Sequence, residues 1–497
     1  MRRSLFIGLS VAGAGLIGAV VPQMPSMALS STRSVPVSVN VTSVHNVSGV
    51  SPWAGLDCNA TNVGTTDTLS VGEPDIAVNP RNPSDQVATW MDLYRDNIDT
   101  AYTTNGGRSW HRSTPMGLND CSGAPYNPAI EGAYDTTVSF GPNGAAYLSS
   151  MEDEHYALPP TSDYAEWTDV QTSTDGGADW SAPVQIPNPL NADDKDMVFA
   201  DQSRPGNVYV AFRNAGFGLL SAPRGVGELL FSRSTNGGRS FKTQVLLSTG
   251  SASTAPYDSQ LAEVDGTLVY TFDTPTGASD ALRSTDGGLQ WTKPVQIAPA
   301  ITIPAPKVCG GLLQTRSDGG HDTVVSGHTI ALVRVNDGKD GTGPGQIELS
   351  KSTDEGRTWQ TSVVLTTPEP IMEAQIAGDA AGRLALAYYE VNLSKTSCGA
   401  NGAAVVPART LVTASADLGQ SWASPQTIGA ASWNIASAGT KNFTFGYWVG
   451  EYFGIAASTP RGFAVVTVQG TPAGRSPGSV PITGQNSVVV AEVKVTG

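Results

Sequence analysis

The chain has 497 residues and a formal net charge of −15 at pH 7. Proteins that bind nucleic acid need a basic face, so this acidic balance argues against such a partner. Only 15% of the residues are charged, whereas 55 are glycine and 33 are proline, a composition typical of many short strands joined by turns.

The first segment, residues 1–28, is predicted to be a secretory signal peptide. Arg2 and Arg3 precede an apolar stretch over residues 5–21, and a small-x-small cleavage site ends at Ala28. An uncleaved membrane anchor is the alternative, because the stretch is nearly long enough to span a bilayer. No later stretch is apolar enough to do so. We therefore expect a secreted, extracellular protein whose mature chain has no membrane span.

The cysteines fit an exported chain. Their number is even, and they are Cys58, Cys121, Cys309 and Cys398. Two disulfides are expected, with three possible pairings. The sequence has no CxxC spacing and no HExxH motif, so we expect no zinc or other cofactor. Calcium held by clustered acids such as Asp194 and Asp196 is kept as an alternative.

One octet recurs six times along the chain. The copies are TTNGGRSW (103–110), STDGGADW (173–180), STNGGRSF (234–241), STDGGLQW (284–291), STDEGRTW (352–359) and SADLGQSW (415–422). A short Asp or Asn side chain accepts backbone N–H groups ahead of it, and the glycines after it adopt positive φ. We therefore interpret Asp175, Asp286, Asp354 and Asp417 as structural turn formers and not as catalysts. The regular spacing predicts a repeated supersecondary unit.

Two short apolar strands separated by a Gly, Pro or Asn turn lie between the octets, as in GEPDIAVNPRNPSDQVATWMD (72–92). A third strand runs into each octet and a fourth follows its aromatic residue. Four antiparallel strands make a propeller blade, so residues 71–497 are predicted to form an all-β propeller. The extended N-terminal segment, residues 29–70, offers a strand that closes the ring. Seven blades are preferred, and six are the alternative.

The octets resemble the Asp-box, or bacterial neuraminidase, repeats of the sialidase superfamily, whose pattern is Ser-x-Asp-x-Gly-x-x-Trp. GEPDIAVNP and GEYFGIAAS also resemble segments of secreted bacterial members of that group. The resemblance covers residues 71 to about 469. It implies a secreted propeller that acts on extracellular glycans, although Asp-box propellers also include binders without enzymatic activity.

In such a blade the octets lie on the same face as the turns between first and second strands, so a site is expected on the opposite face. Carboxylates recur there at the starts of first strands: Glu73, Asp75, Asp135, Asp194, Asp196, Asp258, Asp322, Glu373 and Glu451.

The resemblance implies an exo-sialidase with an arginine clamp, a tyrosine nucleophile activated by a glutamate, and an aspartate as acid/base. The residues assigned to the clamp are Arg95, Arg213 and Arg334. Glu373 with Tyr388 or Tyr389 is the predicted nucleophile pair, and Asp75 or Asp92 is the predicted acid.

Two other functions fit the same face. Two acids across the channel would hydrolyse a neutral glycan as general acid and base. A propeller without enzymatic activity would bind glycans or proteins through the acidic face. In each case we expect a monomer whose partner is an extracellular glycan or glycoprotein.

Overall fold

The computed structural model describes residues 37–53, 71–92, 97–118, 121–123, 130–158, 161–188, 190, 193–214, 227–251, 254–301, 306–313, 321–338, 341–399, 404–437, 449–470 and 486–496. Only the backbone is described for residues 130–131, 153–158, 161–165 and 312. The predicted signal peptide, Cys58 and Arg95 lie outside the described residues. Within them, no helix is long and apolar enough to cross a membrane.

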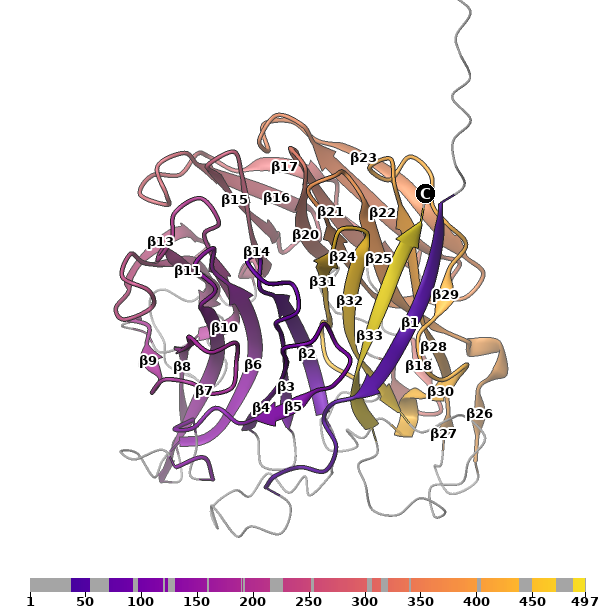
Figure 1. The fold of residues 1–497 in the computed structure, drawn as a ribbon, viewed down its shortest axis with the longest axis horizontal. Helices are drawn as coiled ribbons and strands as arrows, with labels where there is room; N and C mark the ends of the chain where they lie inside the picture. The colour runs from indigo at the N-terminus through magenta and orange to yellow at the C-terminus, as the bar shows by residue number, and fades with distance from the viewer. Residues whose placement is uncertain are drawn as a thin grey trace, which may run out of the picture. The chain divides into compact units, whose positions relative to one another are not determined.

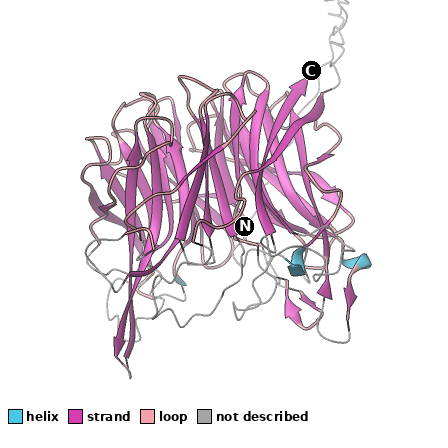
Figure 2. Cartoon of the chain, turned by 60° about the horizontal axis from the view of Figure 1, so that its bottom comes forward, coloured by secondary structure: helices cyan, strands magenta, loops and turns pink. Residues whose placement is uncertain are grey.

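The described chain folds into seven antiparallel blades, almost entirely of strand (Figures 1 and 2). Blade 1 contains β2 (Val71–Val78), β3 (Gln86–Asp92), β4 (Asn97–Thr103) and β5 (His111–Ser113). Blade 2 contains β6 (Ile130–Phe140), β7 (Ala146–Leu158), β8 (Thr161–Ser173) and β9 (Val184–Gln185). Blade 3 contains β10 (Asp193–Ala200), β11 (Val208–Asn214), β12 (Glu228–Ser234) and β13 (Lys242–Ser248). Blade 4 contains β14 (Tyr257–Val264), β15 (Thr267–Asp273), β16 (Ser279–Ser284) and β17 (Val295–Ala298).

The remaining blades follow the same order. Blade 5 contains β20 (His321–Ser326), β21 (Thr329–Asn336), β22 (Gly345–Ser352) and β23 (Gln360–Thr367). Blade 6 contains β24 (Ile371–Gly378), β25 (Leu384–Val391), β28 (Pro407–Ser415) and β29 (Gln426–Thr427), and β30 (Trp433–Asn434) also pairs with β28. Blade 7 contains β31 (Gly454–Thr459), β32 (Gly462–Gly470), β33 (Asn486–Thr496) and β1 (Ser38–Asn46). The predicted all-β propeller of seven blades is confirmed.

Short elements lie outside the blades. The hairpins are β18 (Lys307–Val308) with β19 (Gly311–Leu312) and β26 (Ser397–Cys398) with β27 (Ala404–Val405), and the 3-10 turns are η2 (Leu393–Lys395) and η3 (Ile435–Ser437). A disulfide joins Cys309 to Cys398 and so links these two hairpins. Cys121 is also disulfide-bonded.

The inner strands make the ring. Each one contacts the inner strand of the next blade, in the order β2, β6, β10, β14, β20, β24, β31 and back to β2. The seventh blade takes its outermost strand from the start of the described chain, because β1 pairs antiparallel with β33. This pairing covers an edge that would otherwise expose unpaired backbone groups.

The octets form the turns between the third and fourth strands. In the second copy, the Gly177 N–H donates to Ser173 Oγ at 2.9 Å, and Ser173 Oγ donates to Asp175 Oδ1 at 2.8 Å. The octets lie beside the turns between first and second strands, since the Gly106 N–H donates to the Ser84 carbonyl at 2.9 Å. We call this end of the blades the octet face.

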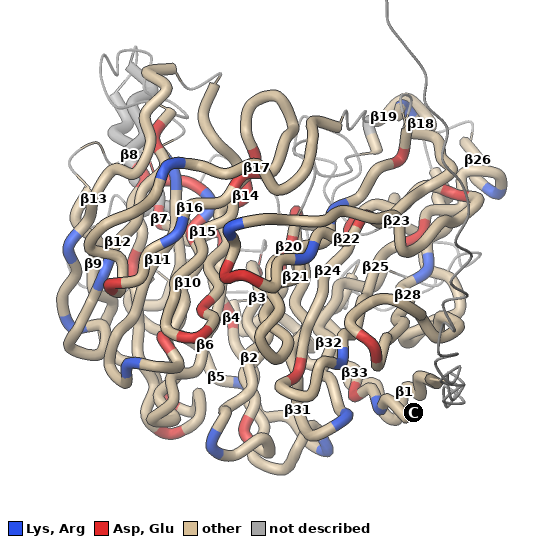
Figure 3. The backbone as a smooth tube through the Cα atoms, turned by 90° about the horizontal axis from the view of Figure 1, so that it is seen from above, with Lys and Arg blue, Asp and Glu red and all other residues tan. Residues whose placement is uncertain are grey.

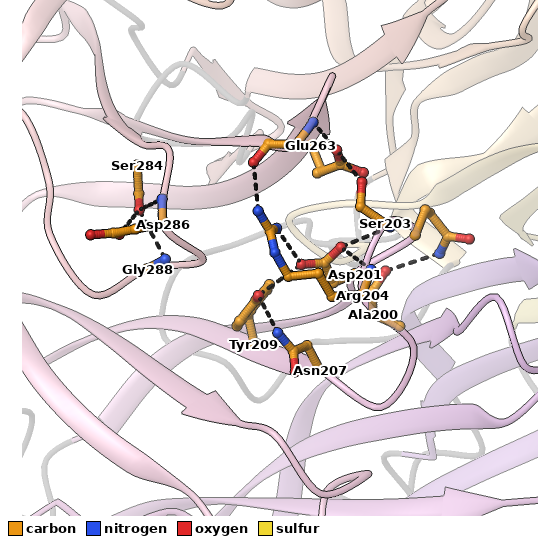
Figure 4. A network of polar contacts seen from close by, with 12 residues as sticks. Ala200, Asp201, Ser203, Arg204, Asn207, Tyr209, Glu263, Ser284, Asp286 and Gly288 are labelled. Atoms are coloured by element: carbon orange, nitrogen blue, oxygen red, sulfur yellow. Dashed lines mark hydrogen bonds and ion pairs between the residues drawn. The ribbon is translucent and has the colours of Figure 1, made fainter.

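The octet face also joins neighbouring blades (Figure 4). In the turn of blade 3, Arg204 Nη1 donates to Asp201 Oδ2 at 2.9 Å and Tyr209 Oη donates to the same oxygen at 2.7 Å. Arg204 Nη2 reaches the Gly266 carbonyl of blade 4 at 3.0 Å, and Ser203 Oγ donates to Glu263 Oε1 at 2.6 Å. The residues of this face therefore hold turns and blades in place.

Candidate functional site

Five of the described inner strands contain a β-bulge at the end of the blades opposite the octets, which we call the bulge face. The register shifts within β2, β6, β10, β14 and β24. The bulges of the first four strands each hold one residue other than glycine at positive φ: Glu73 at 48°, Asp135 at 40°, Lys195 at 56° and Asp258 at 50°. Such values are uncommon in these residues, and strained backbone clusters at functional sites. The bulges thus concentrate chemically active residues from blades 1 to 4 on one face.

Side chains near the bulges also fix the spacing of the blades. In each case a side chain of one blade accepts a backbone N–H of the neighbouring blade. Asp75 Oδ2 accepts the Val138 N–H at 2.8 Å, Thr137 Oγ1 accepts the Val198 N–H at 2.8 Å, and Asp322 Oδ2 accepts the Ile376 N–H at 2.7 Å. Burial raises the pKa of Asp75 to about 7, against the lowering effect of the N–H groups that it accepts. Asp75, a predicted catalytic acid, is therefore a hydrogen-bond acceptor between blades 1 and 2.

One ammonium group gathers three carboxylates from three other blades. Lys195 Nζ lies 3.4 Å from Asp135 Oδ2 and 4.0 Å from Glu73 Oε1, and it also contacts Glu451 Oε2. The Glu451 N–H in turn donates to Glu73 Oε1 at 3.1 Å. We call Glu73, Asp135, Lys195 and Glu451 the acid–lysine cluster. Acidic residues occur on most blades of the ring (Figure 3), and this cluster joins blades 7, 1, 2 and 3.

The pKa values of Glu73 and Asp135 are shifted in opposite directions. Burial, followed by the charge of Asp135, raises the pKa of Glu73 well above its usual value. Burial would also raise the pKa of Asp135, but Lys195 and a hydrogen bond with Glu73 outweigh it and lower that pKa. Two carboxyls whose environments push their pKa values apart are typical of acid–base sites. Of the two carboxyls, Glu73 therefore keeps its proton to the higher pH.

Further polar groups surround the cluster. Tyr452 Oη donates to the Thr136 carbonyl at 3.1 Å, and burial and the charge of Glu73 raise the pKa of its phenol. Burial also raises the pKa of Asp196 well above its usual value, and the charge of Asp135 adds to this shift. Arg213 Nε donates to Asp194 Oδ2 at 2.6 Å, beside the cluster.

One residue of the cluster, Lys195, lines a cavity of about 320 Å³ along the inner strands. Its polar lining includes Asp75, Lys195, Asp196, Asp258, Asp322 and Tyr452. The side chains of Glu451 and Lys195 are 19% and 13% exposed, whereas that of Glu73 is 1% exposed. A ligand in the cavity would therefore meet Lys195 first, and the three carboxylates of the cluster lie behind this ammonium group.

The structure places the described arginines of the predicted clamp in separate ion pairs. Arg213 is buried against Asp194 in blade 3, with its guanidinium 4.0 Å from the ring centroid of Tyr257. Arg334 is buried in blade 5, where Nε and Nη2 donate to Glu348 Oε2 at 2.8 and 2.7 Å. Each guanidinium is already bonded to a carboxylate of its own blade.

The structure places both predicted tyrosines in the core. Tyr389 Oη shares a hydrogen bond of 2.6 Å with Thr467 Oγ1 and accepts the Val468 N–H at 3.0 Å. Burial raises the pKa of Tyr389, and the nearby charge of Glu373 raises it further. Tyr388 is 1% exposed, and burial raises its pKa too. Glu373 and Tyr389 are thus neighbours, but the phenol faces blade 7 and not the cavity.

Asp92, the other predicted acid, is buried on β3. Its Oδ2 lies 3.8 Å from Arg112 Nη2, and its charge contributes to a raised pKa of about 7 at Asp99, where burial is the main cause. Arg112 also forms an ion pair with Asp99. Asp92 therefore belongs to a separate polar group of blade 1.

Sequence reasoning missed two residues of this face. Lys195 stands between Asp194 and Asp196, and alignment of the first strands would have placed it level with Glu73 and Asp135. His321 begins β20 and comes together with two aspartates, Asp258 and Asp273, whose ligand atoms all lie within 4.8 Å of one another and of its own. These three residues are far apart in sequence and match no metal-binding spacing.

No family model matches the sequence, and no curated protein does. Among solved structures, the intramolecular trans-sialidase of leech is 13% identical with a TM-score of 0.45, over 65% of this chain and 65% of its own, which is less than two thirds of its length. The intramolecular trans-sialidase from Ruminococcus gnavus gives the same identity and TM-score over 65% of this chain and 91% of its own. The alpha-L-arabinanase of Penicillium chrysogenum is 12% identical with a TM-score of 0.43, over 71% and 92%.

Proposed function

We propose that the protein hydrolyses glycosidic bonds of neutral extracellular glycans at the acid–lysine cluster. The observation that carries this proposal is the opposite pKa shifts of Glu73 and Asp135, two carboxyls that contact the cavity-lining Lys195. A protonated carboxyl that remains an acid near neutral pH is what protonation of a leaving glycosidic oxygen requires. The resemblance of the octets to sialidase-superfamily repeats supports a glycan as the substrate.

Each residue of the cluster has a role in this reaction. Glu73 gives its proton to the leaving oxygen as the bond to the anomeric carbon breaks. Glu451, the most exposed carboxylate of the cluster, takes a proton from the water whose oxygen attacks that carbon. The charge of Asp135 helps Glu73 to keep its proton, and Lys195 holds Glu451 in an ion pair.

The charges around the cavity favour a neutral sugar. A sialoside carries a carboxylate, which arginine forks bind well only when their N–H groups are available. Arg213 and Arg334 are committed to Asp194 and Glu348. The cavity lining contributes four aspartates, one glutamate and one lysine, and this lysine is already paired with carboxylates of the cluster, so the lining is poorly suited to bind a substrate carboxylate.

An exo-sialidase is the competing proposal. The specific observation in its favour is that Glu373 lies near enough to Tyr389 to raise the pKa of the phenol. A carboxylate next to a phenol is the pair that such a mechanism uses. In this case Tyr389 would have to leave Thr467 and reach the substrate.

The experiment compares fluorogenic neutral glycosides with a fluorogenic sialoside. We expect hydrolysis of a neutral glycoside, and E73Q and E451Q should each lower kcat/KM by about 10²- to 10⁴-fold. E152Q is the matched control, because Glu152 is equally buried, has a raised pKa and lies outside the cluster. Sialoside hydrolysis that is lost in Y389F and kept in E73Q would replace our proposal with the competing one. Binding to a glycan array without any hydrolysis would indicate a binding protein.

A further inference from the structure

Asp258, Asp273 and His321 meet between blades 4 and 5 on the bulge face. Asp258 occupies the bulge of β14. Asp273 is the last residue of β15, and in the strand register it lies opposite Tyr257, the residue before Asp258. His321 begins β20 of the next blade. Each residue is at most 2% exposed. One nitrogen and two carboxylate oxygens from three strands, all within 4.8 Å of one another, form a set of ligand atoms.

Hydrogen bonds orient the His321 imidazole and the Asp273 carboxylate, as is usual for metal ligands. Its Nε2 lies 3.1 Å from Thr271 Oγ1, which also contacts Thr323 Oγ1 at 2.8 Å. Asp273 Oδ1 accepts a hydrogen bond from Ser279 Oγ at 2.6 Å. Metal-binding histidines and carboxylates are usually oriented by such outer hydrogen bonds.

The other ring nitrogen gives the independent observation. His321 Nδ1 is buried and lies 3.2 Å from Asp273 Oδ1, yet among the described residues it has no partner with hydrogen-bond geometry. If Nε2 carries the proton and donates to Thr271, the lone pair of Nδ1 faces a carboxylate. This arrangement is repulsive unless a proton or a metal cation lies between the two atoms. The two atoms lack the geometry of a hydrogen bond, which favours the metal cation.

From these contacts we propose that Asp258, Asp273 and His321 bind one divalent transition-metal ion, with Zn²⁺ as the best match. Imidazole nitrogen with carboxylate oxygen suits Zn²⁺, whereas Ca²⁺ takes six to eight oxygen ligands. Short side-chain movements bring the three ligand atoms to about 2.0–2.2 Å from one centre. Asp258 lines the cavity, which gives the ion a path inward. The bound ion joins blade 4 to blade 5 and keeps a position open for water or a ligand.

The test uses the full chain, stripped with a chelator and titrated with Zn²⁺ by calorimetry, with metal content measured after desalting. We expect one equivalent to bind, and a higher Tm in its presence, because a ligand that binds only the folded state stabilises it. D258N and H321A should each weaken binding at least tenfold. H328A is the matched control, since His328 pairs with Asp265 at an exposed position.

Two outcomes would overturn the site: no binding by the parent chain, or binding retained in both D258N and H321A. The Co²⁺ absorption spectrum provides a second measurement if H321A folds poorly. Loss of the nitrogen ligand in H321Q should change the ligand-field bands, and an unchanged spectrum would exclude His321. These results do not depend on hydrolysis, so they stand apart from the test of the acid–lysine cluster.

Discussion

The two faces of the propeller both carry carboxylates, but their surroundings differ. On the octet face, Asp354 is partly exposed at a turn tip. Burial would raise its pKa, but hydrogen bonds from Thr358 and neighbouring groups lower it to about 2. On the bulge face, Glu73 and Glu152 are buried, and their pKa values rise. The repeated carboxylates of the octets accept N–H groups and are made more acidic, whereas burial makes Glu73 and Glu152 of the bulge face less acidic.

The largest expected effect comes from the second glycine of an octet. A Cβ on Gly288 would lie 2.4 Å from the Phe231 ring of the preceding blade, at a φ of +84°. G288A should lower the free energy of unfolding by about 2–5 kcal/mol, from overpacking and left-handed backbone strain together. The control is G287A, where φ is +72° and the nearest atom lies 3.4 Å away, so only about 1–2 kcal/mol of backbone strain is expected.

Urea unfolding measures both variants. Equal losses in G288A and G287A would contradict the packing role of the second glycine. Because the octet face lies away from the cluster, both variants should keep the kcat/KM of the parent chain under conditions where they are folded.

The fold was more predictable than the site because its signals are local. The turn chemistry of each octet is contained in eight residues, and strand alternation in about as many, so repetition made the blades readable. Glu73 and Glu451 are far apart in sequence, and only closure of the ring brings them together. Whether Tyr389 faces the cavity or blade 7 depends on strand register, which the sequence pattern did not decide.

The second effect should appear in the pH dependence of stability. Burial, and then the charge of Asp169, raises the pKa of Glu152 well above its value in the unfolded chain. The folded state therefore binds the extra proton, and this stabilisation is complete below about pH 4.3 and is lost as the pH rises toward the folded pKa. In the parent chain Glu152 makes the free energy of unfolding fall as the pH rises above about 4.3. E152Q should make that fall less steep, by up to about 1.4 kcal/mol per pH unit.

Unfolding in urea between pH 4 and 8 tests this prediction. The glutamine keeps a carbonyl to accept the Trp167 indole N–H, which Glu152 Oε2 accepts at 3.1 Å, so E152Q should fold. A slope identical to that of the parent chain would mean that Glu152 is ionised in the folded state across this range.

The smallest effect is expected on the octet face and has the opposite sign with pH. Asp354 has a lowered pKa of about 2, so its contribution is present above about pH 4 and is lost as the pH falls toward 2. D354N should cost only a few tenths of a kcal/mol at pH 7, because solvent screens this partly exposed group and two octets already use asparagine in this position. In those octets Asn105 Oδ1 and Asn236 Oδ1 accept the backbone N–H four residues further on, at 3.0 and 3.1 Å.

S352A should cost more, about 1–2 kcal/mol, because the buried Ser352 hydroxyl donates to Asp354 and accepts the Gly356 N–H, both at 2.8 Å. A larger loss in D354N than in S352A at neutral pH would show that the charge, and not the hydrogen-bond pattern, stabilises the turn.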